Sequence, residues 1–207
     1  MTEREKERLF KITSYDRDFW SRPDCILAGM DEVGRGPLAG PVVVSCVVMP
    51  PDPLVEYVND SKKVSEKRRG QIYPKIIETA LDYSVSFVWQ DTIDQINILE
   101  ATKKAFVQAF QSIRLSVTDV MIDALQGLNI EATQHVLIHG DALCYSIAAA
   151  SIIAKVNRDN YMIEMDEKYP EYGFARNKGY GTAEHIAALK KYGPCPLHRR
   201  SFIGKFI

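Results

Sequence analysis

Four carboxylates stand out because each directly follows a short apolar, strand-like run. Asp31 and Glu32 follow ILAGM, Asp123 follows VMI, and Asp141 follows VLIHG. In α/β proteins, sites form where strands end and loops bring distant residues together. Like charges gathered there repel unless a cation compensates them, and carboxylates without His or Cys select a hard ion such as Mg²⁺ or Mn²⁺. The pattern predicts a divalent-metal site made by these four side chains.

The cysteines do not suggest a second kind of site. They are far apart and none belongs to a C-x-x-C pair, which argues against a zinc knuckle, a thioredoxin-like site or a disulfide framework. We interpret them as isolated reduced thiols. They are Cys25, Cys46, Cys144 and Cys195.

Five strand-like segments and several helical ones must position the four carboxylates. The three-glycine segment GRGPLAG requires a loop between the first two strands, and apolar residues at helical spacing over 99–113 predict a helix that Asp91 could cap. The order is three strands, a helix, two strands and a helical C-terminal third, which indicates an α/β domain with a mixed sheet. The expected strands are 25–30, 41–49, 83–89, 119–124 and 135–139, and further helices are expected near 2–10 and from 146 onward.

Two local features bear on how the carboxylates are presented. Neighbouring residues of a regular strand point to opposite faces, so we expect the first strand to end or bulge at Asp31 and Glu32, and Gly34 favours an end. Asp141 lies just before the helix that begins near Ser146, and the dipole of that helix would help to keep it ionised.

Composition is that of one globular domain. The 207 residues are 46% hydrophobic and 26% charged, with a net charge of −1. From Phe174 onward there are seven Lys or Arg against one acid, so a polyanion could meet a local basic face. The apolar runs are too short for a membrane span and the charged N-terminus has no apolar signal region, so we expect a cytoplasmic protein that does not bind membranes.

The segment MDEVGRGPLAGPVVV (30–44) resembles the opening motif of type 2 ribonuclease H, the bacterial ribonuclease HII family. Further blocks match this family in the same order, and together they cover Ile26 to Phe202. The resemblance implies a ribonuclease H-like fold, with a five-stranded mixed sheet flanked by helices and a helical C-terminal region. The further blocks are NDSKKVSEKRR (59–69), IDAL (122–125), HGDALCYSIAAASIIAKVNRD (139–159), NKGYGTAEHIAAL (177–189) and HRRSF (198–202).

The resemblance also implies an activity. It is endonucleolytic cutting of the RNA strand of RNA–DNA hybrids, and cutting 5′ of single ribonucleotides in duplex DNA, leaving 3′-hydroxyl and 5′-phosphate ends. It implies two-metal-ion hydrolysis with Mn²⁺ or Mg²⁺, which needs no side-chain nucleophile. The implied substrates are RNA–DNA hybrids and ribonucleotide-containing DNA duplexes, and the implied role is ribonucleotide removal and RNA primer processing. Nothing in the sequence suggests more than a monomer.

The family's acidic tetrad corresponds to the four carboxylates already singled out: Asp31, Glu32, Asp123 and Asp141. Its ribose-reading element corresponds to Gly34, Arg35 and Gly36, its sugar-stacking tyrosine to Tyr180, and its backbone-binding segment to Ser61, Lys62 and Lys63. Arg199 and Arg200 are further candidates for phosphate contact. The resemblance implies a catalytic domain over 25–207 and leaves residues 1–24 as an N-terminal arm of unknown role.

Two other functions share parts of this pattern. A DNA-cutting junction resolvase would also use clustered acids, but it has no use for a reader of the ribose 2′-hydroxyl such as Gly34-Arg35-Gly36. A non-catalytic hybrid-binding protein would be expected to have lost at least one of the carboxylates. Type 3 ribonuclease H shares the chemistry but carries an N-terminal substrate-binding domain that a 24-residue arm cannot supply.

Overall fold

The computed structural model describes residues 1–207, and its centre is one five-stranded mixed sheet. The strand order is β3-β2-β1-β4-β5; β2 is antiparallel to β1 and β3, whereas β4 is parallel to β1 and β5. This confirms the expected fold class. The strands are β1 (Leu27–Val33), β2 (Val42–Val48), β3 (Asp82–Val88), β4 (Asp119–Asp123) and β5 (Thr133–Leu137).

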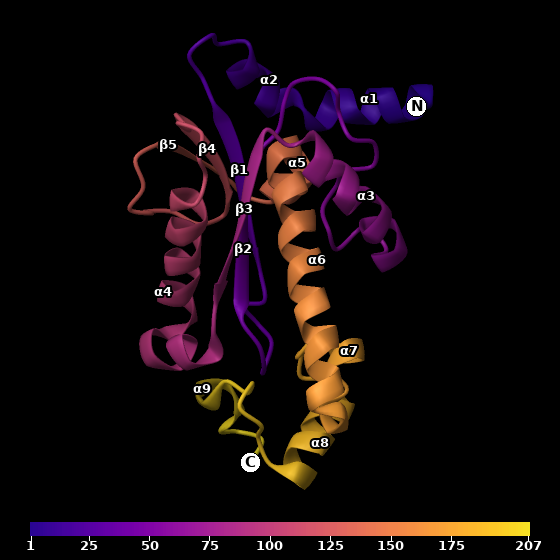
Figure 1. The fold of residues 1–207 in the computed structure, drawn as a ribbon, viewed down its shortest axis with the longest axis vertical. Helices are drawn as coiled ribbons and strands as arrows, with labels where there is room; N and C mark the ends of the chain where they lie inside the picture. The colour runs from indigo at the N-terminus through magenta and orange to yellow at the C-terminus, as the bar shows by residue number, and fades with distance from the viewer.

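Helices cover both faces of the sheet (Figure 1). On one face α4 (Gln90–Gln111) packs through Phe106 and its alanines against alternate residues of β1 and β2. On the other face lies α6 (Tyr145–Lys168), whose small residues allow it to approach β1 so closely that a side chain at Gly29 would collide with the Ser146 backbone. Because β2 is buried on both faces, its run VVVSCVV is apolar almost throughout.

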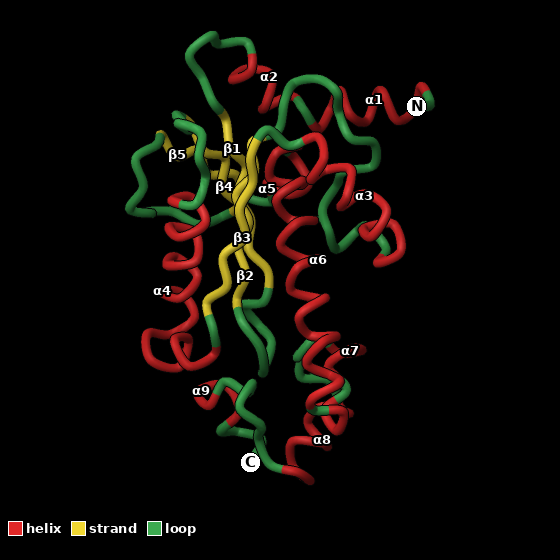
Figure 2. The backbone as a smooth tube through the Cα atoms, viewed as in Figure 1, coloured by secondary structure: helices red, strands yellow, loops and turns green.

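Of the remaining helices, α3 (Glu66–Thr79) lies beside α6, and most of the others lie at the two ends of the sheet (Figure 2). The arm forms two helices at one end, beside the start of α6, and the C-terminal third forms short helices at the other. These other helices are α1 (Glu3–Ile12), α2 (Ser14–Trp20), α5 (Gly140–Leu143), η1 (Pro170–Tyr172), α7 (Phe174–Asn177), α8 (Ala183–Tyr192) and α9 (Arg200–Ile203). No helix has both the length and the apolar character needed to cross a bilayer.

One prediction about α4 is wrong. The helix begins at Gln90, so Asp91 lies in its first turn and does not cap it. A kink at Asn97, where φ is 66°, divides α4 in two. The Asn97 side chain accepts hydrogen bonds from the backbone N–H groups of Leu99 and Glu100, at 2.9 and 3.1 Å. The second half of α4 is therefore capped internally.

Candidate active site

The site begins at an open edge of β1. The strand continues without a bulge through Asp31 and Glu32, which pair with Ser45 and Val44 of β2, so the expected end or bulge at these two residues is wrong. On the other edge of β1, pairing with β4 stops at Met30. Beyond that point the edge is free, and both neighbouring carboxylates come under the influence of Asp123 although their positions alternate between the faces of the sheet.

The four carboxylates influence one another electrostatically. Burial, followed by the charges of Glu32 and Asp123, raises the pKa of Asp31 well above its usual range. Burial also raises the pKa of Glu32; Arg35, whose Nη1 lies 3.4 Å from Glu32 Oε1, opposes the shift, and Asp123 adds to it. For Asp141, burial and then its acidic neighbours raise the pKa. The protein thus holds mutually repelling acids in a poorly hydrated place.

The donor set fits hard divalent cations. Oε2 of Glu32 is buried and has no hydrogen-bond partner, so one carboxylate oxygen there is left for a ligand that is not protein. As the side chains stand, no three His, Cys, Asp or Glu converge closely enough to enclose an ion. Repelling carboxylates are expected to stay apart until a cation compensates them. An all-oxygen set of this kind suits Mg²⁺ or Mn²⁺.

Asp141 reaches the site from α5, the short helix between β5 and α6. His139 adopts a left-handed conformation with φ 60°, and the following Gly140 N–H donates to Asp123 Oδ1 at 2.8 Å. A Cβ at Gly140 would come within 2.5 Å of Ile147 Cδ1 in α6, so the absence of a side chain lets this turn pack closely against the helix. The turn therefore fixes the third and fourth carboxylates relative to each other.

The segment 60–63 lies beside Asp141. Lys62 Nζ is 3.5 Å from Asp141 Oδ2 while its side chain remains 80% exposed. Partial burial opposes the shift, yet the neighbouring carboxylates, Asp141 foremost, raise the pKa of Lys62. Lys63 instead lies 3.6 Å from Asp60. Ser61 is buried, and its hydroxyl accepts from that of Ser151 at 2.7 Å. Burial of this side chain argues against the predicted contact with substrate.

The loop after β1 carries the predicted ribose reader. Gly34 has φ 94°, and a Cβ there would lie 2.3 Å from Arg158 Nε, so glycine is required. Gly36 is different, since its φ is not left-handed and the only atom near an added Cβ would be Tyr180 Cε1 at 4.0 Å. Tyr180 is 41% exposed, so its ring and the loop of Gly36 lie side by side at the surface. The structure brings these predicted residues together.

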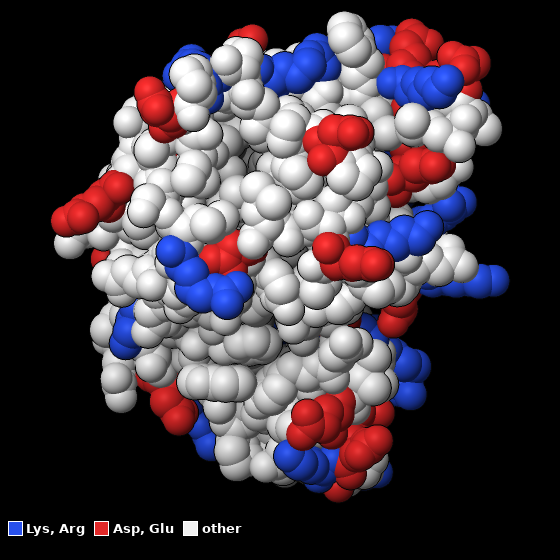
Figure 3. Space-filling model, turned by 45° about the horizontal axis from the view of Figure 1, so that its top comes forward, with Lys and Arg blue, Asp and Glu red and all other residues white.

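The C-terminal arginines behave differently from the prediction. Arg199 is fully buried and donates to backbone carbonyl groups, so its predicted contact with phosphate is wrong. Arg200 is exposed. Lys178 is also buried. Two of the seven basic residues expected on the basic face of the C-terminal third, Lys178 and Arg199, are therefore not exposed there. On the face shown in Figure 3, charges of both signs are interspersed.

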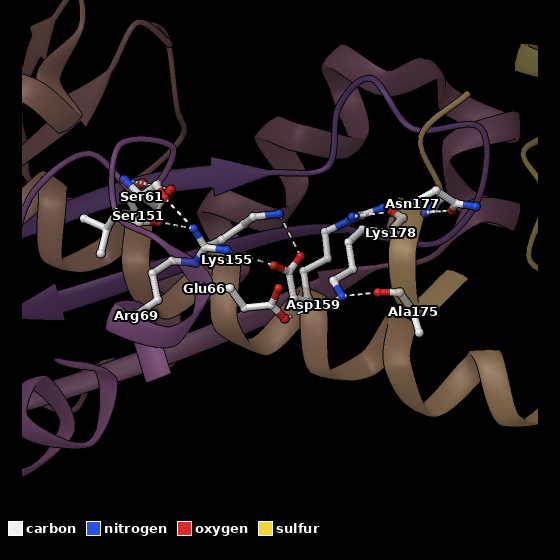
Figure 4. A network of polar contacts seen from close by, with 12 residues as sticks. Ser61, Glu66, Arg69, Ser151, Lys155, Asp159, Ala175, Asn177 and Lys178 are labelled. Carbon is white, nitrogen blue, oxygen red and sulfur yellow. Dashed lines mark hydrogen bonds and ion pairs between the residues drawn. The ribbon is translucent and has the colours of Figure 1, made fainter. Parts of the chain in front are cut away.

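A polar network beside α6 connects segment 60–63 with the loop that carries Tyr180 (Figure 4). Arg69 donates to Ser61 O at 2.8 Å and lies 3.6 Å from Asp159, which in turn pairs with Lys155 at 2.7 Å. At the far end, Lys178 Nζ donates to Ala175 O and lies 3.7 Å from Glu66 at the start of α3. Helices α3 and α6 together therefore connect segment 60–63 to the loop that carries Tyr180.

Sequence reasoning missed three residues of this region. Asp60 contributes a further carboxylate close to Asp141, and its place in the motif NDSKK was the available signal. The Ser151 hydroxyl donates to that of Ser61 at 2.7 Å, and Ser151 also partly offsets the raised pKa of Asp31. Arg158 is buried beneath the loop of Gly34. Nothing in the local sequence distinguishes the last two from an ordinary helical serine and a surface arginine.

Comparisons with known proteins agree with this architecture. A family model described as Ribonuclease HII matches residues 28–205. The ribonuclease HII of Ruminiclostridium cellulolyticum is 48% identical over 205 residues, which are 99% of this chain and 80% of that protein. The ribonuclease HII of Lactobacillus johnsonii is 53% identical over 190 residues, 91% of this chain and 75% of the relative. The crystal structure of ribonuclease H2 from Pyrococcus horikoshii superposes with a TM-score of 0.72 at 30% identity, covering 84% of this chain and 92% of that one.

The five-stranded mixed sheet and the helices on its two faces define a protein of the ribonuclease H-like fold. Within that class, the chain belongs to the ribonuclease HII family and is a ribonuclease H, a hydrolase.

Proposed function

We propose that the protein cuts the RNA strand of RNA–DNA hybrids and cuts 5′ of single ribonucleotides embedded in duplex DNA, leaving 3′-hydroxyl and 5′-phosphate ends. Its role would be ribonucleotide removal and RNA primer processing. The observation that carries the proposal is the unpartnered, buried Glu32 Oε2 amid the other three carboxylates, next to the loop of Gly34 and Gly36. Family membership supports the reaction type.

In this proposal Asp31, Glu32, Asp123 and Asp141 hold two divalent ions, Mn²⁺ or Mg²⁺. When bound, such ions lower the pKa of water, so that it attacks phosphate at neutral pH, and stabilise the charge on the leaving oxygen. The chain itself supplies negative ligands fixed on a sheet and on a helix-flanked turn. Gly140 N–H holds Asp123 Oδ1 at 2.8 Å, so this ligand is oriented before any ion arrives.

Recognition of the ribonucleotide would come from the surface beside the acids. The backbone of Gly34, Arg35 and Gly36 would approach the 2′-hydroxyl, the group that separates RNA from DNA locally. The exposed ring of Tyr180 would stack on the adjacent sugar.

The segment 61–63 would meet the phosphate backbone. Exposed Lys62 is placed to meet a phosphate near Asp141, and Lys63 would add charge without reading sequence. Buried Ser61 would hold the segment rather than touch the substrate.

The test is cleavage of an end-labelled DNA duplex carrying one ribonucleotide, beside an all-DNA duplex and a long RNA–DNA hybrid. Each is incubated with Mn²⁺, with Mg²⁺ and with a chelator. We expect metal-dependent cutting immediately 5′ of the ribonucleotide and no cutting of all-DNA. Cutting of the long hybrid alone would overturn the single-ribonucleotide specificity. Cutting of all-DNA would favour a resolvase-like activity. The expected cytoplasmic location and monomeric state belong to this proposal and are checked by fractionation and by the mass in solution.

A further inference from the structure

Two arginines lie fully buried beneath the loop that follows β1. Arg158 comes from α6 and Arg199 from the turn before α9, and both side chains are 0% exposed. Neither guanidinium is hydrogen-bonded to a carboxylate; every donor contact goes to a backbone carbonyl oxygen. A buried cation without a paired anion is rare in proteins, because desolvation of the charge is costly.

Arg199 joins the two ends of this loop. Its Nη2 and Nη1 donate to Gly34 O and Arg35 O at 2.6 and 2.9 Å, and its Nε donates to Gly40 O at 2.9 Å. The backbone N–H of Arg199 donates to Leu38 O at 2.9 Å. One side chain, 165 residues further along the chain than Gly34, thus fixes the carbonyl groups on both sides of the turn.

Arg158 joins the same loop to the Tyr180 loop. Its Nε donates to Pro41 O at 3.0 Å and its Nη2 to Ala39 O at 3.2 Å, while its Nη1 donates to Lys178 O at 2.9 Å. The backbone repeats this connection, since Leu38 N–H donates to Gly179 O at 2.8 Å. The loop after β1 and the loop that carries Tyr180 are therefore held together by Arg158 and by the backbone.

A chain of hydrogen bonds from the Arg199 segment also reaches Tyr180. Cys195 N–H donates to His198 Nδ1 at 3.0 Å, His198 Nε2 is 3.0 Å from His185 Nε2, and His185 Nδ1 is 2.9 Å from Tyr180 O. Because a carbonyl only accepts, His185 carries its proton on Nδ1 and His198 carries its proton on Nε2. Burial lowers the pKa of both imidazoles, in keeping with this neutral pair.

Holding two guanidinium groups so close together costs stability. Burial, and then the nearby charge of Arg158, lower the pKa of Arg199 to about 9. An apolar residue could fill the same space without this cost. Only a planar guanidinium with donors in a fixed fork satisfies three carbonyl oxygens that point in different directions, and lysine cannot replace it.

We propose that Arg199 and Arg158 are positioning residues that hold the loop of Gly34, Arg35 and Gly36 at a fixed distance from Tyr180, and thereby set the selectivity for a ribonucleotide. This role rests on the proposed function, in which these two surfaces read the sugar. Neither arginine touches the substrate. Both act from beneath the loops, through main-chain carbonyl groups.

The experiment compares the wild type with Arg199→Gln and Arg199→Lys. The matched control is Arg176→Gln, which removes a charge from an exposed side chain of α7 that pairs only with Glu184. Hydrogen exchange of the Leu38, Ala39 and Gly40 amides is measured without substrate, and kcat and KM are measured on a single-ribonucleotide duplex and on a long hybrid. Melting curves establish that each variant is folded.

We expect loop exchange to accelerate about tenfold or more in both Arg199 variants, with unchanged exchange in β2. On the single-ribonucleotide duplex, kcat should fall about 100-fold with KM close to wild type, and the long hybrid should be affected less. Arg199→Lys keeps the charge but spans one carbonyl at most, so it should not restore selectivity. Arg176→Gln should match the wild type.

The outcomes separate this role from the proposed function. If wild-type protein does not cut the single-ribonucleotide duplex, the proposed function fails whatever the variants do. If it does cut, equal losses on both substrates, or unchanged selectivity in a folded Arg199 variant, overturn the positioning role. Should neither variant fold, the wild-type protein still decides: amides at 38–40 that exchange as freely as unstructured chain would contradict a clamped loop.

Discussion

Oδ1 of Asp16 accepts two hydrogen bonds from Ser146, one from the backbone N–H at 2.9 Å and one from the hydroxyl at 2.5 Å, although 130 residues separate the two in the chain. Oδ2 accepts from the Tyr145 N–H at 2.9 Å. Cys144 at the N-cap position of α6 makes no side-chain cap bond, so the arm supplies the cap from outside. The helix that follows Asp141 is thus fastened at its start by residues 1–24, for which the sequence suggested no role.

Replacing Asp16 should weaken the fold. Asp16→Ala removes a buried acceptor from two backbone N–H groups and one hydroxyl, and we expect the free energy of unfolding to fall by about 2 kcal/mol or more. Urea unfolding measures the loss. Asp18→Ala, on the same helix but exposed, should change it by less than about 0.5 kcal/mol. Equal effects of the two changes would show that Asp16 does not cap α6.

The arm should also make stability depend on pH through Glu5. Its carboxylate is bound by Arg8 at 2.7 and 2.8 Å and by the Tyr57 N–H at 2.6 Å. The hydrogen bond from Arg8 lowers the pKa of Glu5 below its usual value, although partial burial opposes this. A carboxyl group whose pKa is lower in the folded state stabilises the fold above its unfolded pKa of about 4.3 and loses that contribution as pH falls through the folded value.

Unfolding free energies measured between pH 7 and pH 3 test this linkage. Wild-type protein should lose more stability over that range than Glu5→Gln, which has no charge to lose there. Glu3→Gln, an exposed position on the same helix, should follow the wild-type curve. Parallel curves for wild type and Glu5→Gln would contradict the role given to Glu5.

The sequence predicts some elements of the fold and of the candidate site and not others. The strands could be predicted because runs such as VVVSCVV record burial on both faces, and Asp31 and Asp123 could be selected because they end or border such runs. The sequence pattern does not predict helix α3, because Gly70 and Pro74 interrupt it; burial of Ile72 and Ile76 stabilises the helix in the folded protein. The sequence does not predict the cap that Asp16 provides or the burial of Arg199, because their partners lie 130 and 165 residues away.

Neutralising one member of the acidic set should separate binding from cutting. In Asp123→Asn the remaining oxygen still accepts from the Gly140 N–H, so the turn keeps its shape. We expect the single-turnover cutting rate to fall by about 1000-fold with little change in hybrid affinity. Robust residual cutting would remove Asp123 from the proposed metal site.

Metal binding by the acidic site should be measurable from the melting temperature, without an activity assay. Asp31→Asn relieves repulsion among buried acids, so the metal-free variant should melt about 2–4 °C above metal-free wild type, for about 1 kcal/mol of relief. Adding Mn²⁺ should raise the melting temperature of wild type more than that of the variant, because the variant lacks one ligand charge. Equal increments would indicate that Asp31 does not bind the ion.

Two glycines of the loop after β1 should respond differently to substitution, because Gly34 is confined by the fold and Gly36 is open to the substrate side. A methyl group at Gly34 would meet Arg158 at 2.3 Å on a backbone with φ 94°, so Gly34→Ala should lower the melting temperature and the activity together. A methyl group at Gly36 has only Tyr180 near it, at 4.0 Å, and strains nothing. Gly36→Ala should therefore melt like wild type yet cut a single-ribonucleotide duplex about 100-fold more slowly, because the added carbon stands where the sugar must approach. Wild-type cutting by a folded Gly36→Ala protein would mean that the substrate does not come close to this backbone.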